Sequence, residues 1–160
     1  MKGMTIIVKT ISGWVKILVF LFGIYIILFG DLSPGGGFAG GVVIACSYVL
    51  LMLAFGREYM EKNFPPALAL RLLCGGALVF IAIALSGLVY GLFAEPRDAT
   101  GFFWNFIYQK DVFGGRVEML KAGIIPLAEI AIGLIVGSSL FWIIFKLSTF
   151  RPESAEGEKE

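Results

Sequence analysis

The chain has 160 residues, of which 58% are hydrophobic and only 16% charged, and its mean hydropathy is +0.89. Charged residues make up about a quarter of a typical soluble domain, so this composition excludes a soluble globular protein and indicates an integral membrane protein. The formal net charge of +1 leaves no basic surface that would neutralise a nucleic-acid backbone, so we expect no nucleic-acid partner.

Four apolar stretches follow one another along the chain, at residues 11–29, 38–55, 72–94 and 122–145. Each is long enough to cross about 30 Å of hydrocarbon as a helix. They predict an all-α membrane protein with four transmembrane helices in a single domain over residues 1–150. Residues 151–160 are rich in Glu, Lys, Ser and Gly and are predicted to form a mobile polar tail, because they contain too little apolar surface to bury.

The first span is followed by a glycine-rich link whose last residues enter the second span. Its notable residues are Pro34, Gly35, Gly36, Gly37, Phe38, Gly40 and Gly41. Three of the glycines formally satisfy G-x-G-x-x-G, but a dinucleotide site requires a preceding strand, and here a membrane helix precedes the motif. Glycines four apart leave a smooth helix face, which favours close helix packing. An alternative is that the exposed amides of the turn line a polar pore.

Two ionisable residues belong to the first span and its outer end. Lys16 lies near the predicted start of the span, where its stem can extend and place the ammonium at the cytoplasmic interface. Asp31 follows the span, where it either attracts a cation to the mouth of an ion path or is simply solvated. Both are candidates for an ion pathway.

The fourth span contains the acid Glu129. Pro126, Gly133 and Gly137 flank the same helix face, which predicts that this face packs against protein, most naturally another subunit. Glu129 lies eight residues beyond Lys121, so if the helix begins near Ala122 the carboxyl lies about 12 Å into the hydrocarbon, not far from the midplane. An acid there must be paired, protonated or in contact with water, so Glu129 either belongs to an ion pathway or fixes an interface.

The distribution of basic residues predicts the orientation. Eight of them occur before the first span, between the second and third, and after the fourth, at Lys2, Lys9, Arg57, Lys62, Arg71, Lys146, Arg151 and Lys159. The long stretch between the third and fourth spans carries four more, at Arg97, Lys110, Arg116 and Lys121, but it is the least informative, because acidic residues accompany them and its length weakens the bias. The link between the first two spans has none. By the positive-inside rule, both termini should be cytoplasmic.

The chain has few residues of the types that bind metals or haem or that catalyse reactions. The chain has no histidine, and its two cysteines, Cys46 and Cys74, lie in separate apolar runs. Haem, iron–sulfur and zinc sites need clustered ligands of these types, and hydrolysis needs a base or grouped carboxylates. We therefore expect no cofactor, no metal site and no enzymatic activity of this chain on its own.

One pattern of residues resembles a known family. The pattern is Gly30-x-x-Ser33-Pro34-Gly35-Gly36-Gly37-Phe38-x-Gly40-Gly41, between the first two of four spans. It is similar to the B subunit of multisubunit Mrp/Mnh-type sodium/proton antiporters. The resemblance extends to the fourth span, at residues 126–134. Many members have histidine where this chain has Asp31 and glutamine where it has Ala39, so the resemblance assigns no role to those two side chains.

The resemblance implies an accessory subunit without a cofactor, assembled with larger channel-forming antiporter subunits in the lipid of a prokaryotic plasma membrane. Na+ and H+ are then the expected transported ions. The same type of subunit resembles one in archaeal membrane-bound hydrogenases and related respiratory complexes, so a membrane-arm subunit of such a redox complex is the alternative. A four-helix drug/proton exporter fits poorly, because those proteins have an essential acid in the first span, where this chain has Lys16.

Overall fold

The computed structural model describes residues 4–30, 34–93, 103 and 124–148, without the side chains of residues 90–92. All the regular structure within these residues is helical. The helices are α1 (Ile6–Leu28), α2 (Gly36–Phe55), α3 (Arg57–Asn63), α4 (Pro66–Phe93) and α6 (Ile125–Leu147). Asp31 and the predicted tail at residues 151–160 lie outside the described residues.

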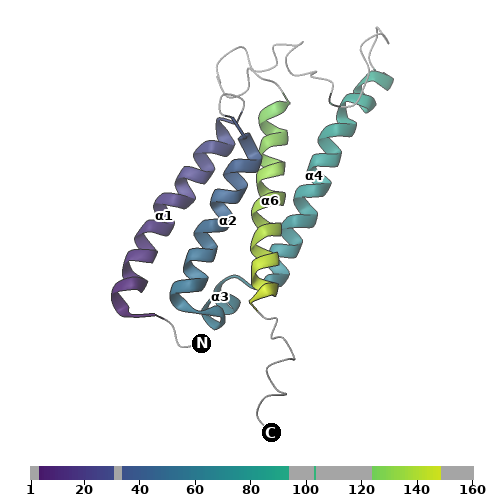
Figure 1. The fold of residues 1–160 in the computed structure, drawn as a ribbon. Coiled ribbons are helices and arrows are strands. Elements are labelled where there is room, and N and C mark those ends of the chain that lie inside the picture. Colours follow the sequence, from purple (N-terminus) through teal and green to yellow (C-terminus); the bar gives the residue numbers. More distant parts are fainter. Residues whose placement is uncertain (1–3, 31–33, 94–102, 104–123, 149–160) are drawn as a thin grey trace.

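The four long helices have the length and apolarity of membrane spans. Their most apolar windows have mean hydropathies between 2.1 and 2.5. They stand side by side in the order α1, α2, α6, α4, so that α2 and α6 are central and α1 and α4 lie at the edges (Figure 1). The prediction of an all-helical protein with four transmembrane helices is confirmed.

The helix bounds differ from those expected at the N-terminal ends of α1 and α4. The first helix begins at Ile6 rather than Ile11, and the polar pair Lys9 and Thr10 lies within it. The Thr10 hydroxyl donates a hydrogen bond to the Ile6 carbonyl at 3.0 Å, so this side chain bonds within the helix instead of ending it.

The helix α4 begins at Pro66 rather than Leu72 and therefore includes Arg71. Proline suits a first helical position, because the N–H group that it lacks would have no partner there.

The other two spans differ by only two or three residues. The second begins at Gly36 instead of residue 38, and α6 runs from Ile125 to Leu147 instead of from 122 to 145. Pro126 occupies the first turn of α6, again where a missing N–H group has no cost. The short helix α3 had no counterpart among the predicted elements.

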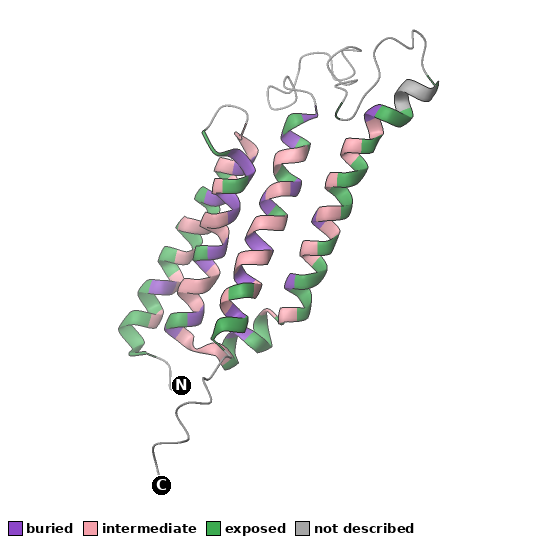
Figure 2. Ribbon diagram, turned by 45° about the vertical axis from the view of Figure 1, so that its right-hand side comes forward, coloured by how far each residue is buried: buried purple, intermediate pink, exposed green. Residues whose placement is uncertain are grey.

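Burial follows the position of each helix in the row. Figure 2 shows that buried residues concentrate along α2 and α6, while α1 and α4 are largely exposed. Large apolar side chains cover the exposed faces of these two outer helices, among them Ile7, Trp14, Leu18, Phe22, Leu78 and Ile81. A continuous apolar surface of this kind is expected where a protein meets lipid or a partner.

The two ends of the helix row have different chemistry. At one end α3 covers a cluster of buried residues from α2, α3, α4 and α6, namely Met52, Met60, Ala69, Phe141 and Phe145. The helix segments at this end carry basic residues, including Lys9 near the start of α1, Arg57 and Lys62 on α3, and Lys146 near the end of α6. The end of α1 and the start of α2 lie at the opposite end (Figure 1).

Candidate functional site

Three helices meet at the end of the row where α1 leads into α2. We call the contact of Gly30, Gly36, Gly37 and Glu129 the glycine–glutamate junction. Gly30 follows α1, the next two glycines open α2, and Glu129 comes from α6. A Cβ atom placed on Gly30 would lie 3.1 Å from Cγ of Glu129, so the glutamate side chain reaches the link between α1 and α2.

The turn into α2 requires glycine for its backbone. Gly35 has a φ of +107° and Gly36 a φ of +42°, conformations that residues with a Cβ atom rarely adopt. Gly36 also has no room for a side chain, because a Cβ atom there would lie 2.6 Å from Oε1 of Glu129. The dense glycines of the link therefore let the backbone turn sharply and pass close to a carboxylate.

The carboxylate of Glu129 caps the N-terminus of α2. The Gly37 N–H group, in the first turn of that helix, donates a hydrogen bond to Oε2 of Glu129. First-turn amides have no partner within their own helix, and in a membrane such a group must be satisfied by protein. A carboxylate also interacts favourably with the positive end of the helix dipole.

The described helix places Glu129 closer to the start of its span than expected. Because α6 begins at Ile125 and not near Ala122, Glu129 is the fifth residue of the helix and lies about 6 Å along the axis from its start. Within the described residues, its hydrogen-bond partner is the chain's own Gly37.

Small residues continue from the junction along the faces where α2 meets its neighbours. The buried members are Gly23 on α1, Gly36, Gly37, Gly40, Gly41 and Ala45 on α2, and Pro126, Gly133 and Gly137 on α6. A Cβ atom on Gly40 would lie 2.7 Å from the Gly23 carbonyl oxygen. The backbones of α1, α2 and α6 thus approach each other too closely for larger side chains.

These contacts predict a graded response to alanine at two facing glycines. A Cβ atom on Gly41 would lie 2.8 Å from the Gly133 carbonyl oxygen, whereas one on Gly137 would lie no closer than 3.3 Å to any neighbour. We expect Gly41→Ala to destabilise the protein by about 1–3 kcal/mol through overpacking and Gly137→Ala to cost less than about 1 kcal/mol. Thermal unfolding in detergent measures both. Equal losses would contradict the close approach of α2 to Gly133.

The remaining candidates from the sequence lie apart from the capped amide. Pro34 is exposed in the turn, and Phe38 is 63% exposed on the outer side of α2. Lys16 lies near the middle of α1, away from the junction, with its Nζ atom 5.1 Å from the centre of the Tyr48 ring. The sequence did not single out Tyr48 as a partner of Lys16, because one aromatic residue in an apolar span is ordinary. Among the described residues, no group of three or more His, Cys, Asp or Glu side chains lies together.

Similarity to known proteins identifies the family. A family model described as a domain related to the MnhB subunit of Na+/H+ antiporters matches residues 7–142. The chain belongs to this MnhB family. The match includes all of α2, α3 and α4 and most of α1 and α6, so the junction lies inside the MnhB domain.

Individual relatives are similar to the chain over most of its length. An uncharacterized protein of Methanocaldococcus jannaschii is 32% identical over 149 residues, which are 90% of this chain and 52% of that protein. The chain thus spans about half the length of this archaeal relative. A Staphylococcus saprophyticus protein named as antiporter subunit mnhB2 is 31% identical over 71% of each chain. Its namesake in Staphylococcus aureus strain Newman is 30% identical over 78% of this chain and 86% of its own.

Proposed function

We propose that the chain is a non-catalytic accessory subunit of a multisubunit Na+/H+ antiporter in a prokaryotic plasma membrane. The observation that carries this proposal is the MnhB match over residues 7–142, which covers most of the four-helix domain. Two bacterial relatives that carry antiporter subunit names support it. The other subunits of such an antiporter are the proposed partners, with Na+ and H+ as the transported ions and membrane lipid around the outer helices.

The described ionisable groups fit an accessory role better than a complete transport pathway. A proton relay needs several acids or lysines at intervals across the membrane. Of the described carboxylates, Glu129 alone lies in a long helix, and it is bonded to a backbone amide at one end of the row. We therefore assign Glu129 to fixing the junction, and we place the principal ion path in the larger subunits.

The proposed orientation has both termini in the cytoplasm. The described basic residues Lys9, Arg57, Lys62 and Lys146 share the end of the row where α1 begins and α6 ends. The positive-inside rule places this end on the cytoplasmic side. The glycine–glutamate junction then faces the outside of the cell.

Mass spectrometry of the intact complex, purified in mild detergent from the organism's own membranes, tests the function. We expect this chain to co-purify with other antiporter-type subunits and with no redox subunit. Nickel–iron hydrogenase or quinone-reductase-like subunits in the same particle would instead make it a membrane-arm subunit of a respiratory complex. A chain that purifies without any partner would refute both assignments.

A further inference from the structure

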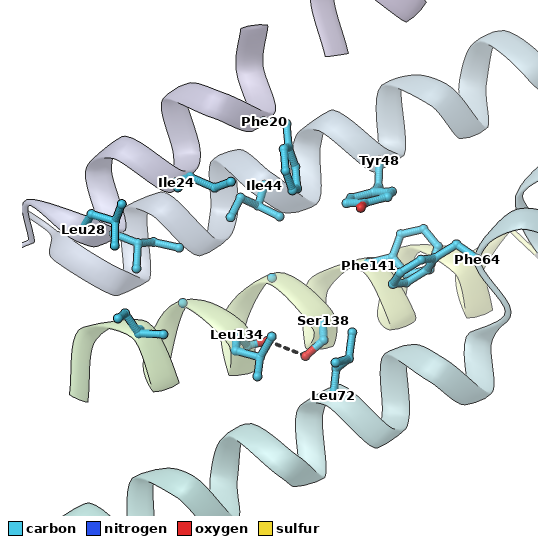
Figure 3. A pocket seen from close by; sticks show the side chains of 14 residues that line it. Phe20, Ile24, Leu28, Ile44, Tyr48, Phe64, Leu72, Leu134, Ser138 and Phe141 are labelled. Carbon is cyan, nitrogen blue, oxygen red and sulfur yellow. Dashed lines mark hydrogen bonds between the residues drawn. The ribbon is translucent and has the colours of Figure 1, made fainter. Parts of the chain in front are cut away.

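An apolar groove runs along one face of the helix row. Residues from α1, α2, α6 and the start of α4 line it, including Phe20, Ile24, Tyr48, Leu72, Leu134 and Phe141 (Figure 3). Its volume is about 380 Å³. Phe20 lies 5.9 Å from Tyr48 between ring centres, and Tyr48 lies 5.9 Å from Phe141, so aromatic rings form one end of the groove.

Lys16 reaches the aromatic end of this groove. It precedes Phe20 by one helical turn on the same face of α1, and its Nζ atom lies over the ring of Tyr48. The earlier start of α1 makes Lys16 the eleventh of 23 residues, about 15 Å from the helix start. The charge therefore lies about halfway along the described helix and not near its first residue.

The described part of the chain offers Lys16 no counter-charge. Glu58 and Glu61 are exposed on α3, and no ion pair joins either of them to Lys16. Glu129 is bonded to Gly37 at the end of the row where α2 begins, away from Lys16. The contact with Tyr48 offsets only part of the cost of an ammonium group at this depth. A carboxylate from outside these residues would compensate the charge.

We propose that the groove receives a transmembrane helix of a partner subunit, whose Asp or Glu side chain pairs with Lys16. The inference rests on the proposed assembly into a multisubunit membrane complex. The apolar lining of the groove requires an apolar occupant, and Lys16 requires that this occupant carry one acid at the matching depth. The pair would fix the register of the partner helix, as a single buried polar contact does in other helix assemblies.

A partner helix meets these requirements better than the other possible occupants. Phosphate groups of lipids lie at the membrane surface, whereas Lys16 lies halfway along a helix that is long enough to span the bilayer. The chain's own residues 149–160 follow α6 and carry four glutamates, but their polar composition does not suit an apolar groove. An acyl chain would fill the groove without neutralising the ammonium.

A photo-crosslinking experiment on the assembled complex tests the occupant. Benzoylphenylalanine replaces Phe20 in the groove or, as a control, Leu18, which is 67% exposed on another face of α1. We expect the Phe20 position to crosslink to a partner's membrane segment that contains Asp or Glu, and the Leu18 position to give no such product. Crosslinks from Phe20 only to lipid, to residues 149–160 or to an acid-free segment would overturn the proposal.

Removing the charge gives an independent test. Lys16→Met keeps an unbranched apolar side chain, so the amount of this chain in the membrane should not fall, while the yield of intact complex should fall roughly tenfold. Lys16→Arg should keep the yield within about twofold of wild type. Lys9→Met is the matched control, because Lys9 makes a similar contact with Phe55, at 5.9 Å, but lies near the helix end. An unchanged complex yield for Lys16→Met would overturn the proposal.

These results separate the docking proposal from the proposed function. Antiporter-type subunits that co-purify with wild type, without the expected crosslink, refute the docking proposal alone. A crosslink to an acid-bearing helix of a hydrogenase subunit refutes the antiporter assignment and supports the docking proposal. A wild-type chain without partners refutes both.

Discussion

Gly37→Ala is expected to separate α2 from α6 and to cause the largest loss of stability among alanine substitutions at the described glycines. A Cβ atom on Gly37 would overlap the backbone carbonyl oxygen of Glu129 and lie 2.8 Å from Oε2 of the same residue. The carbonyl oxygen belongs to the α6 backbone, so no rotation of a side chain relieves the overlap. The helices must move apart, which also breaks the hydrogen bond from the Gly37 N–H group to the carboxylate.

The expected cost is about 3 kcal/mol or more, because overpacking and the loss of a buried hydrogen bond act together. The midpoint of thermal unfolding in detergent and the yield of purified complex measure it. Gly75→Ala in α4 is the matched control, since a Cβ atom there meets nothing within 4 Å and alanine has the higher helix propensity. A Gly37→Ala protein as stable as the Gly75→Ala protein would show that α2 and α6 do not approach as closely as described.

The sequence was sufficient to predict the four membrane spans but not the residues at which all of the helices begin. Apolar stretches of about 20 residues predict membrane helices because the bilayer sets the length that they must cross. Charged residues are a poorer guide to where these helices begin. Lys9 and Arg71 both lie inside helices, since a helix can continue beyond its apolar part when its backbone hydrogen bonds are satisfied. Because α1 begins five residues earlier than expected, Lys16 lies farther from the start of its helix than the sequence indicated.

The candidate site residues were easier to select from the sequence than to place in contact with one another. Glycine density identified the link, and helical spacing placed Glu129 on a protein-facing side of its span. Their hydrogen bond joins residues 92 positions apart, and no local pattern indicates which helices of a four-helix protein are neighbours. The sequence did not indicate the groove, because the apolar residues that line it are ordinary for membrane spans. Lys16 is the exception, since a charge within a span always needs a physical explanation.

Two substitutions at Glu129 distinguish a cap from an ion-conducting group. Glu129→Ala leaves the Gly37 N–H group without an acceptor, so we expect a loss of about 1–3 kcal/mol and a reduced yield of complex. Glu129→Gln retains an acceptor oxygen and removes the charge, and amide side chains cap helices nearly as well as carboxylates. We therefore expect the glutamine variant to assemble normally and to keep most of its Na+/H+ exchange.

Exchange measured in membrane vesicles, together with complex yield and thermal unfolding, separates the two roles because they respond to different properties of the side chain. A cap depends on an acceptor atom, so alanine damages it and glutamine preserves it. A proton or sodium pathway depends on a titratable charge, so glutamine would abolish exchange while assembly stays intact. Glu61→Gln on the exposed side of α3 controls for the loss of one carboxylate and should change neither quantity. Abolished exchange in an intact Glu129→Gln complex would move Glu129 from the packing of the junction into the transport mechanism itself.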